Sequence, residues 1–256
     1  MRHSRVDTVS TYSRRGIHGH VVNELGLRIT RGHLDAGQVI DPNELVQSFG
    51  VSRTVIREAL KVLATKGLVD ARPKRGTFIT ERARWQLLDG DVIRWRAGGN
   101  PDPLLLIELG EVRLAIEPVA ARMAAKRRTD THLEEMKRAL DAMGNWDGVS
   151  RETVVAADLA FHSALLRAAG NELLEQFEVV LEPALEARDA LAHSHSDDRA
   201  FYRTHLTVFE AIRDRDPDAA QTAMNDMMKI AIRDAEDALR AVDGGAALLA
   251  AREPAV

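Results

Sequence analysis

The chain of 256 residues contains no cysteine. This absence excludes a disulfide scaffold and any metal site built from thiolates, and it is compatible with a reducing cytosol. No apolar run reaches the length of a transmembrane helix, and the polar first residues lack the apolar core of a signal peptide. No internal repeat or low-complexity tract is evident. These absences lead us to expect a cytoplasmic protein that does not enter a membrane.

Charge is divided unevenly along the chain, although the formal net charge is only −4. Residues 1–82 contain 14 lysines and arginines against 8 acidic residues, a local net charge of +6, so the remainder has a net charge of −10. The length is typical of one or two domains, and a hydrophobic content of 45% is sufficient for true cores. A basic head on an acidic body is the distribution expected of a protein whose N-terminal domain binds nucleic acid.

Two short amphipathic helices joined by a tight turn are predicted around residue 50. The helix-cap, first-turn and turn positions hold Asp41, Pro42, Glu44, Gly50 and Ser52. The apolar positions at helical spacing are Leu45, Val46, Phe49, Val55, Ile56, Ala59, Leu60 and Leu63. This pattern predicts two helices that bury one face each and expose the other.

The exposed first turn of the second helix carries hydroxyl and guanidinium groups, at Ser52, Arg53, Thr54 and Arg57. Such groups at the start of a helix suit insertion of that helix into the DNA major groove with its N-terminus leading. The alternative is an ordinary helical hairpin whose arginines are solvated. The residues that follow the second helix help to decide between the two interpretations.

A hairpin is predicted directly after the second helix. Gly67 ends the helix in the manner of a C′ glycine, and strands are predicted at residues 68–72 and 77–80. The turn between these strands presents Lys74, Arg75 and Gly76. A basic tip can reach phosphates or the minor groove, and a glycine there lets the backbone come close. The combination predicts a winged helix-turn-helix.

This part of the chain resembles the DNA-binding domain of GntR-type bacterial transcription factors. The resemblance rests on Gly50-Val51-Ser52-Arg53-Thr54, Arg57-Glu58-Ala59-Leu60, Gly67-Leu68 and Arg75-Gly76-Thr77-Phe78-Ile79. It implies DNA contacts by Arg53, Thr54, Arg57 and the wing residue Gly76, with Ser52 beside them. Members of the family often have an arginine at the place of Asn43, so the resemblance implies an altered or missing contact at that position.

Composition predicts a domain boundary between residues 81 and 103. We expect a flexible arm at residues 1–13, the winged domain at 14–82 and a linker with a short helix at 83–103. Strand signals end there, and helical periodicity predicts an all-α bundle at 104–243, followed by a tail at 244–256. The helices of this bundle are expected at residues 103–127, 130–143, 150–169, 171–192, 199–214 and 216–242.

Polar residues interrupt the apolar stripes of the predicted bundle. Asp158 and His162 are four residues apart, so they project from the same side of one helix, and His205 lies among apolar residues of a later helix. Carboxylate and imidazole groups that face each other inside a bundle suit a divalent metal ion such as Zn²⁺, Ni²⁺ or Mn²⁺. The alternative left open by the spacing is a buried Asp–His hydrogen bond without metal.

These residues resemble the FCD ligand-binding domain, which belongs to the FadR branch of the GntR family. The resemblance also covers the helix Glu111-Val112-Arg113-Leu114-Ala115-Ile116-Glu117-Pro118. Many such domains hold a metal with one Asp and three His, which implies that Asp158, His162 and His205 are ligands. The place of the third His holds Met227, whose thioether is a poor ligand for hard divalent ions. The implied site is therefore weaker, open to water or effector at one position, or absent.

Arg113 shares a helix face with apolar residues, so its guanidinium is expected to point into the bundle. A guanidinium in that place can hold a carboxylate ligand in a bidentate fork. The alternative is an intrahelical pair with Glu117, four residues further along. Members of the family often use an arginine here for organic acids, so the resemblance favours contact with an effector. The polar loop at residues 193–198 is expected to be a solvated connector.

A further resemblance, to the galactonate-responsive repressors of this family, rests on Trp85, Leu88-Asp89, Asp91-Val92-Ile93 and Trp95, together with Glu111-Val112-Arg113 and with Met227 at the place of the third His. It implies a sugar acid, such as an aldonate, as the effector. We therefore expect a homodimeric repressor that reads an inverted repeat in double-stranded DNA and is released by a small carboxylate. Two alternatives remain, a metal-dependent enzyme acting on a small acid or lactone and a purely architectural dimeric DNA-binding protein. The enzyme alternative lacks an evident general base and leaves the winged head unexplained.

Overall fold

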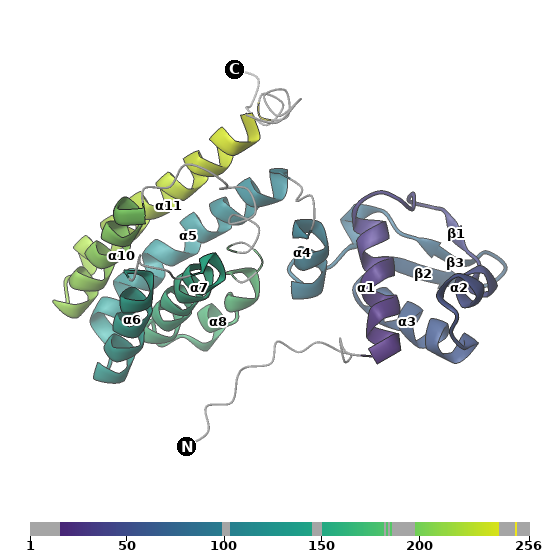
Figure 1. The fold of residues 1–256 in the computed structure, drawn as a ribbon, viewed down its shortest axis with the longest axis horizontal. Coiled ribbons are helices and arrows are strands. Elements are labelled where there is room, and N and C mark those ends of the chain that lie inside the picture. Colours follow the sequence, from purple (N-terminus) through teal and green to yellow (C-terminus); the bar gives the residue numbers. More distant parts are fainter. Residues whose placement is uncertain are drawn as a thin grey trace. The chain divides into compact units, whose positions relative to one another are not determined.

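The computed structural model describes residues 16–98, 103–144, 150–181, 183, 185, 198–240 and 249. The chain forms two compact units, one up to Gly98 and the other from Gly99, and each is described by itself (Figure 1). The expected arm, the expected loop up to residue 197 and the expected tail apart from residue 249 lie outside the described residues. No described helix is long and apolar enough to cross a membrane.

The N-terminal unit packs helices against a small sheet, and the predicted winged helix-turn-helix is confirmed. Its first elements are α1 (Gly16–Thr30), β1 (Val39–Ile40), α2 (Pro42–Phe49), α3 (Arg53–Thr65), β2 (Val69–Arg72) and β3 (Gly76–Ile79). The strand order is β1-β3-β2 and all pairs are antiparallel, so the second wing strand lies in the middle. Strand β1, in which Val39 pairs with Phe78, was not expected, because two residues are too few to show a strand pattern.

Local signals set the ends of α2 and α3. Asp41 and Ser52 each accept a hydrogen bond from a backbone N–H of the first helical turn, at 2.8 and 3.3 Å. Gly50 follows α2 with φ 63°, and Gly67 follows α3 with φ 77°, both in the left-handed region. A Cβ at Gly67 would also overlap the carbonyl oxygen of Arg84. Glycine is therefore required at the end of α3 both by conformation and by space.

The segment after the wing packs back onto the same unit. It contains the short helix η1 (Arg82–Arg84) and α4 (Gly90–Ala97), whose N-cap residue is Asp89. Helix α4 contacts α1, and Trp95 is buried in the hydrophobic cluster that also holds Leu25. The range that the sequence assigns to a linker thus carries a helix that belongs to the N-terminal compact unit.

A buried ionic cluster joins this segment to the end of α3. The Nζ atom of Lys66, a residue only 2% exposed, lies 2.8 Å from both oxygens of Asp89 and 2.8 Å from Oδ2 of Asp91. Arg94 pairs with the other oxygen of Asp91 at 2.9 Å. The backbone N–H of Gln86 donates to the carbonyl oxygen of Lys66 at 3.0 Å. Two ion pairs of Lys66 and one backbone hydrogen bond therefore hold the end of helix α3 to the following segment.

The C-terminal unit is helical throughout its described elements, which confirms the predicted all-α bundle. Its helices are α5 (Pro103–Arg127), α6 (Asp130–Met143), α7 (Arg151–Ala168), α8 (Glu172–Glu175), α10 (Asp198–Arg213) and α11 (Pro217–Arg240). Helices α5 and α11 lie side by side, and α6 packs on α7 (Figure 1). The prediction of one helix at 171–192 differs from the structure, because Gln176 and Phe177 form a turn after α8. Backbone bonds of the i to i+3 type tighten the chain at this turn.

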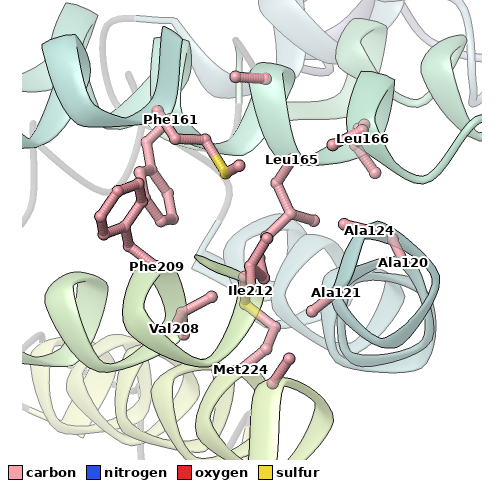
Figure 2. Packing of buried hydrophobic residues seen from close by; sticks show 14 of the residues in the cluster. Ala120, Ala121, Ala124, Phe161, Leu165, Leu166, Val208, Phe209, Ile212 and Met224 are labelled. Atoms are coloured by element: carbon pink, nitrogen blue, oxygen red, sulfur yellow. The ribbon is translucent and has the colours of Figure 1, made fainter. Parts of the chain in front are cut away.

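The core of this unit is built from buried residues of α5, α6, α7, α10 and α11. Figure 2 shows Phe161, Leu165 and Leu166 of α7 together with Val208, Phe209 and Ile212 of α10, Met224 of α11 and Ala120, Ala121 and Ala124 of α5. Burying each large apolar side chain here contributes about 1.5–3 kcal/mol. Because α7 and α10 are held together by this core, His162 and His205 come close, with ring centroids 5.5 Å apart. Packing thus positions the polar site described below.

Candidate DNA interface and candidate metal centre

The exposed face of α3 carries four of the residues predicted to touch DNA, namely Ser52, Arg53, Thr54 and Arg57. The opposite face is buried in the core of the N-terminal unit. Arg57 approaches Glu58 at 3.7 Å, and both side chains are exposed. An ion pair of this kind contributes little in water, so it does not prevent Arg57 from turning to another partner.

A groove of about 550 Å³ lies between α3, the start of α2 and strands β2 and β3. Arg53, Thr54 and Arg57 line this groove, together with Asn43 and Lys61. The groove therefore offers three cationic side chains and, with Thr77, three uncharged polar ones on a single concave surface. Asn43 lines the groove at the position where members of the resembling family often have an arginine. The side chain here is therefore an amide instead of a guanidinium.

Two charged residues of this groove were not predicted as part of it. Lys61 follows Arg57 by four residues and so shares its helix face, a signal that the sequence contains. Asp70 also lines the groove, where its negative charge opposes contact with DNA. Its carboxylate pairs with Arg84 at 2.8 Å and with Arg72 at 3.7 Å, and the hydrogen bond from Arg84 lowers the pKa of Asp70. These arginines offset the charge of the carboxylate.

The wing tip forms a second, separate group of predicted DNA contacts. Lys74, Arg75 and Gly76 are exposed, and none of them is among the residues that line the groove. Lys74 and Gly76 both have left-handed backbones, with φ of 66° and 80°, which makes the turn tight. The guanidinium of Arg75 lies 3.7 Å from the ring centroid of Phe78, so this side chain rests on the wing strand.

In the helical unit, α7 and α10 bring together Asp158, His162 and His205, all of them buried. Oδ1 of Asp158 lies 2.8 Å from Nε2 of His205 and 3.3 Å from Nε2 of His162. One ligand atom from each residue lies within 4.8 Å of the other two. The three residues that the sequence singled out therefore share one site.

The other ring nitrogen of each histidine also has a partner. Nδ1 of His205 lies 2.9 Å from the carbonyl oxygen of Phe201, and Nδ1 of His162 pairs with Oε2 of Glu117. The Phe201 carbonyl, the Glu117 carboxylate and the Asp158 carboxylate all accept hydrogen bonds, so the Nδ1 and Nε2 atoms of each neutral ring compete for its one hydrogen. A metal ion at Nε2 would leave that hydrogen on Nδ1. The sequence analysis considered Glu117 only as a partner of Arg113. No sequence spacing links it to His162, because the two residues belong to different helices.

Arg113 is buried beside the same cluster. Its Nε donates to Oε1 of Glu117 at 2.5 Å, and its Nη2 lies 3.1 Å from Nε2 of His162. The intrahelical pair that the sequence allowed is therefore present, and the guanidinium reaches the three-residue cluster as well. The intrahelical pair with Glu117 and a contact of Arg113 with a carboxylate effector therefore do not exclude each other.

Burial and mutual attraction shift the pKa values of this cluster. Burial raises the pKa of Glu117, but the Arg113 guanidinium and the His162 imidazole outweigh it and lower the pKa to about 2. Burial also opposes the charge of Asp158, yet hydrogen bonds from His162 and His205 hold its pKa well below the usual value. Burial lowers the pKa of His162 and Glu117 raises it, with a net upward shift. Both carboxylates are therefore ionised at neutral pH.

The arrangement of donor atoms fits a divalent metal ion. In a tetrahedral site with bonds of about 2.0–2.2 Å, neighbouring ligand atoms stand about 3.3 Å apart. The separation of 3.3 Å between Asp158 and His162 matches, and the 2.8 Å between Asp158 and His205 would open slightly on binding. Among the described residues this group supplies three ligands, which leaves a position for water or an effector oxygen. Met227 is buried in the hydrophobic cluster of the unit.

A small cavity of about 10 Å³ adjoins Arg113 and Glu117, and it is otherwise lined by apolar side chains. This volume is close to the minimum for a single water molecule. A sugar acid can therefore enter at this cavity only if its wall moves. Part of that wall is formed by Phe177, which lies in the turn after α8, and by Val180 and Leu181, which follow this turn.

A winged DNA-binding head followed by a helical unit with a buried Asp–His cluster defines a class of two-domain DNA-binding proteins. The chain belongs to the bacterial regulatory proteins of the GntR family, whose model matches residues 18–79, and an FCD domain matches residues 108–229. The protein is thus a DNA-binding transcriptional regulator with an FCD domain and not an enzyme. The predicted family and fold class are both confirmed.

Curated relatives support this assignment over most of the chain. The chain is 33% identical over 219 residues to the galactonate operon transcriptional repressor of Escherichia coli K12, which covers 83% of this chain and 94% of that protein. It is 31% identical to the transcriptional regulator LutR of Bacillus subtilis, over 77% of this chain and 90% of that protein. It is 29% identical to the repressor NanR of Klebsiella aerogenes, over 85% and 84%.

Solved structures show the same fold. One is the structure titled "Lar controls the expression of the Listeria monocytogenes agr system and mediates virulence". It aligns with a TM-score of 0.65 and 16% identity, over 88% of this chain and 99% of that one. McbR/YncC of E. coli aligns with a TM-score of 0.50 and 17% identity, over 87% and 98%. At these identities the likeness concerns the fold alone.

Proposed function

We propose that the protein is a homodimeric repressor that leaves its operator when a sugar acid such as galactonate binds the helical unit. One observation carries this proposal: Nη2 of Arg113 lies 3.1 Å from Nε2 of His162 inside a buried site. A fixed positive charge and three metal-ligating atoms therefore share one place. The 33% identity to a galactonate operon repressor supports a sugar acid as the class of effector.

A divalent ion of the Zn²⁺, Ni²⁺ or Mn²⁺ class would be held by Oδ1 of Asp158 and by the Nε2 atoms of His162 and His205. Such an ion supplies a Lewis-acid centre for oxygen atoms of the effector. Arg113 would neutralise the effector carboxylate, which loses its hydration on entering a dry site. An aldonate suits this arrangement because its hydroxyl stands next to its carboxylate and offers a second oxygen.

On the DNA side, we assign base reading to the residues Ser52, Arg53, Thr54, Arg57 and Lys61. Arginine and hydroxyl groups on a helix inserted in the major groove recognise base edges. Lys74, Arg75 and Gly76 at the wing tip would approach the phosphate backbone or the minor groove. A homodimer would place two copies of α3 on the two halves of an inverted repeat.

The effector acts through its differential affinity for two states of the protein, one that binds the operator and one that does not. Because the cavity at Arg113 is too small for a sugar acid, binding has to displace part of its wall. This displacement of the wall is the structural change through which effector binding would alter the DNA affinity of the N-terminal heads. The proposal therefore predicts that DNA affinity and effector affinity are reciprocally coupled.

Arg113→Gln tests the proposal. We expect the variant to hold the operator like wild type but to bind galactonate weakly and to stay on DNA in its presence. Operator binding would be followed by fluorescence anisotropy and acid binding by calorimetry on the same preparation. Arg122→Gln is the matched control, because Arg122 lies on the same helix and pairs at the surface with Asp218.

Two results would overturn the proposal at different points. If Arg113→Gln binds and responds to galactonate like wild type, the effector site lies elsewhere. If wild type keeps its operator affinity across a panel of aldonates, with and without added metal, effector control by such acids is wrong. An architectural DNA-binding dimer would then be the better description.

A further inference from the structure

Glu117 is a buried carboxylate with a different functional group at each of its oxygens. Oε1 accepts from Nε of Arg113 at 2.5 Å, and Oε2 pairs with Nδ1 of His162. We propose that Glu117 is a positioning residue that orients His162 toward a divalent metal ion and fixes Arg113 beside that ion. This role rests on the metal and effector site proposed above and assigns a further residue to it.

Glu117 contacts the side of the His162 imidazole that faces away from Asp158. A metal-ligating histidine usually donates its second N–H to a carboxylate or a backbone carbonyl, which fixes the tautomer and the ring orientation. His205 has such an acceptor in the carbonyl oxygen of Phe201 at 2.9 Å. For His162 the acceptor group nearest to Nδ1 is the Glu117 carboxylate, whose Oε2 is in ion-pair contact with it without the alignment of a hydrogen bond. Both rings are thus held with Nε2 toward Asp158 before any ion binds, and Glu117 is the one acceptor of the two that a substitution can remove.

Glu117 also contributes to the charge balance of the buried cluster. With neutral imidazoles, Asp158 and Glu117 contribute two negative charges and Arg113 one positive charge, so these buried groups have a net charge of −1. A divalent ion changes this to +1, and an effector with one carboxylate restores neutrality. Without Glu117, the ion would share a buried site with a guanidinium and a single carboxylate, and an excess of buried positive charge is strongly unfavourable. The same count favours monocarboxylates over dicarboxylates as effectors.

These arguments predict opposite effects for two neutralising substitutions on α5. Glu117→Gln removes the anionic acceptor of His162 and should weaken metal binding about 10–100-fold. Arg113→Gln removes a positive charge 3.1 Å from a ligand nitrogen and should leave metal affinity unchanged or raise it. Each variant breaks the same buried ion pair, so a loss of metal affinity caused only by general destabilisation would appear in both.

The experiment uses the full-length protein, stripped of metal with a chelator and titrated with Co²⁺ alone. The visible absorption of bound Co²⁺ reports its coordination, and competition with a metal-binding dye gives the affinity. Glu111→Gln is the control for charge, because it makes the same change at an exposed position of the same helix. Far-UV circular dichroism before titration establishes that each variant is folded.

We expect Glu111→Gln to bind Co²⁺ with the affinity of wild type and Arg113→Gln to bind it at least as tightly as wild type. Glu117→Gln should bind Co²⁺ far more weakly than wild type, with an altered spectrum. A Glu117→Gln affinity equal to that of Glu111→Gln would overturn the role of Glu117 and leave the metal site standing. Equal losses in Arg113→Gln and Glu117→Gln would also overturn it, because the ion pair as a whole would then be what matters. Failure of wild type to bind Co²⁺ would overturn the metal site and this role with it.

Discussion

Replacing Lys66 by methionine is expected to destabilise the N-terminal unit by about 3 kcal/mol, although Lys66 does not line the candidate DNA groove. Methionine keeps most of the volume of the lysine side chain but removes an ammonium group that lies 2.8 Å from both Asp89 and Asp91. The side chain of Asp91 is only 4% exposed, so its carboxylate cannot recover full hydration in the variant.

The magnitude follows from the surroundings of the two carboxylates. Removing one partner of a buried ion pair costs about 3–5 kcal/mol, because the other partner stays buried without it. Asp89 is 23% exposed, and Asp91 keeps its contact with Arg94, so the lower end of this range applies. On the same helix, Lys61 pairs with Glu58 at exposures of 63% and 45%, and such a pair contributes about 0–1 kcal/mol. Lys61→Met is therefore the matched control for stability.

Urea unfolding followed by tryptophan fluorescence would measure the loss. Of the three tryptophans, Trp85 and Trp95 belong to the N-terminal unit, and the ring of Trp95 lies 5.8 Å from Nζ of Lys66. A cost for Lys66→Met no larger than that of Lys61→Met would refute the reasoning. Adding Asp91→Asn should restore part of the lost stability if a stranded carboxylate is the cause. If the stability losses of Lys66→Met and Asp91→Asn add up in the double variant, the electrostatic explanation of the Lys66→Met loss is refuted.

Three more measurements address DNA reading, the metal and pH. Arg57→Ala should weaken specific operator binding by about 1–3 kcal/mol, whereas Lys74→Ala should weaken all sequences alike and flatten the salt dependence, as gel-shift titrations at several salt concentrations would show. Met227→His should strengthen Co²⁺ binding in calorimetry if residue 227 faces the metal site as the family resemblance implies, and an unchanged affinity would count against that placement. The pKa of Glu117 falls from the ordinary 4.5 to about 2 on folding, so the unfolded chain takes up the proton first and stability is lost as pH falls from 4.5 toward 2. Acid unfolding followed by circular dichroism should be less steep over this interval in Glu117→Gln than in wild type.

The winged domain was predictable because its signals are local. A cap such as Ser52 acts on a backbone group only three residues away, and Gly50 and Gly67 allow left-handed backbones that other residues rarely adopt. Strand β1 was not predictable, since its two residues gain their conformation from pairing with β3. The turn at Gln176 and Phe177 carries no glycine or proline, so periodicity alone continued the helix through it.

The candidate metal centre was predictable only in part. Asp158 and His162 are one helical turn apart, so spacing places them together. The contact of Glu117 with His162 depends on how α5 packs on α7, and local spacing offered Arg113 as the partner of Glu117 instead. Both contacts exist because a carboxylate has two oxygens. Helical spacing predicts a partner on the same helix, such as Arg113 for Glu117. It does not predict a partner on another helix, such as His162.

Charge balance distinguishes the two buried ionic clusters of this protein. In the N-terminal unit, Lys66 and Arg94 oppose Asp89 and Asp91, so the charges of these four groups cancel. In the helical unit, Arg113 opposes Glu117 and Asp158, and these groups are left with one negative charge when the imidazoles are neutral. Burial opposes a charge on His162, but the Glu117 carboxylate outweighs it and raises the pKa of this imidazole, so its surroundings favour a positive charge there. A divalent ion would supply more positive charge than a proton does, and the excess is what an anionic effector would neutralise. The first cluster can therefore be purely structural, whereas the second has the charge of a site that binds cation and anion together.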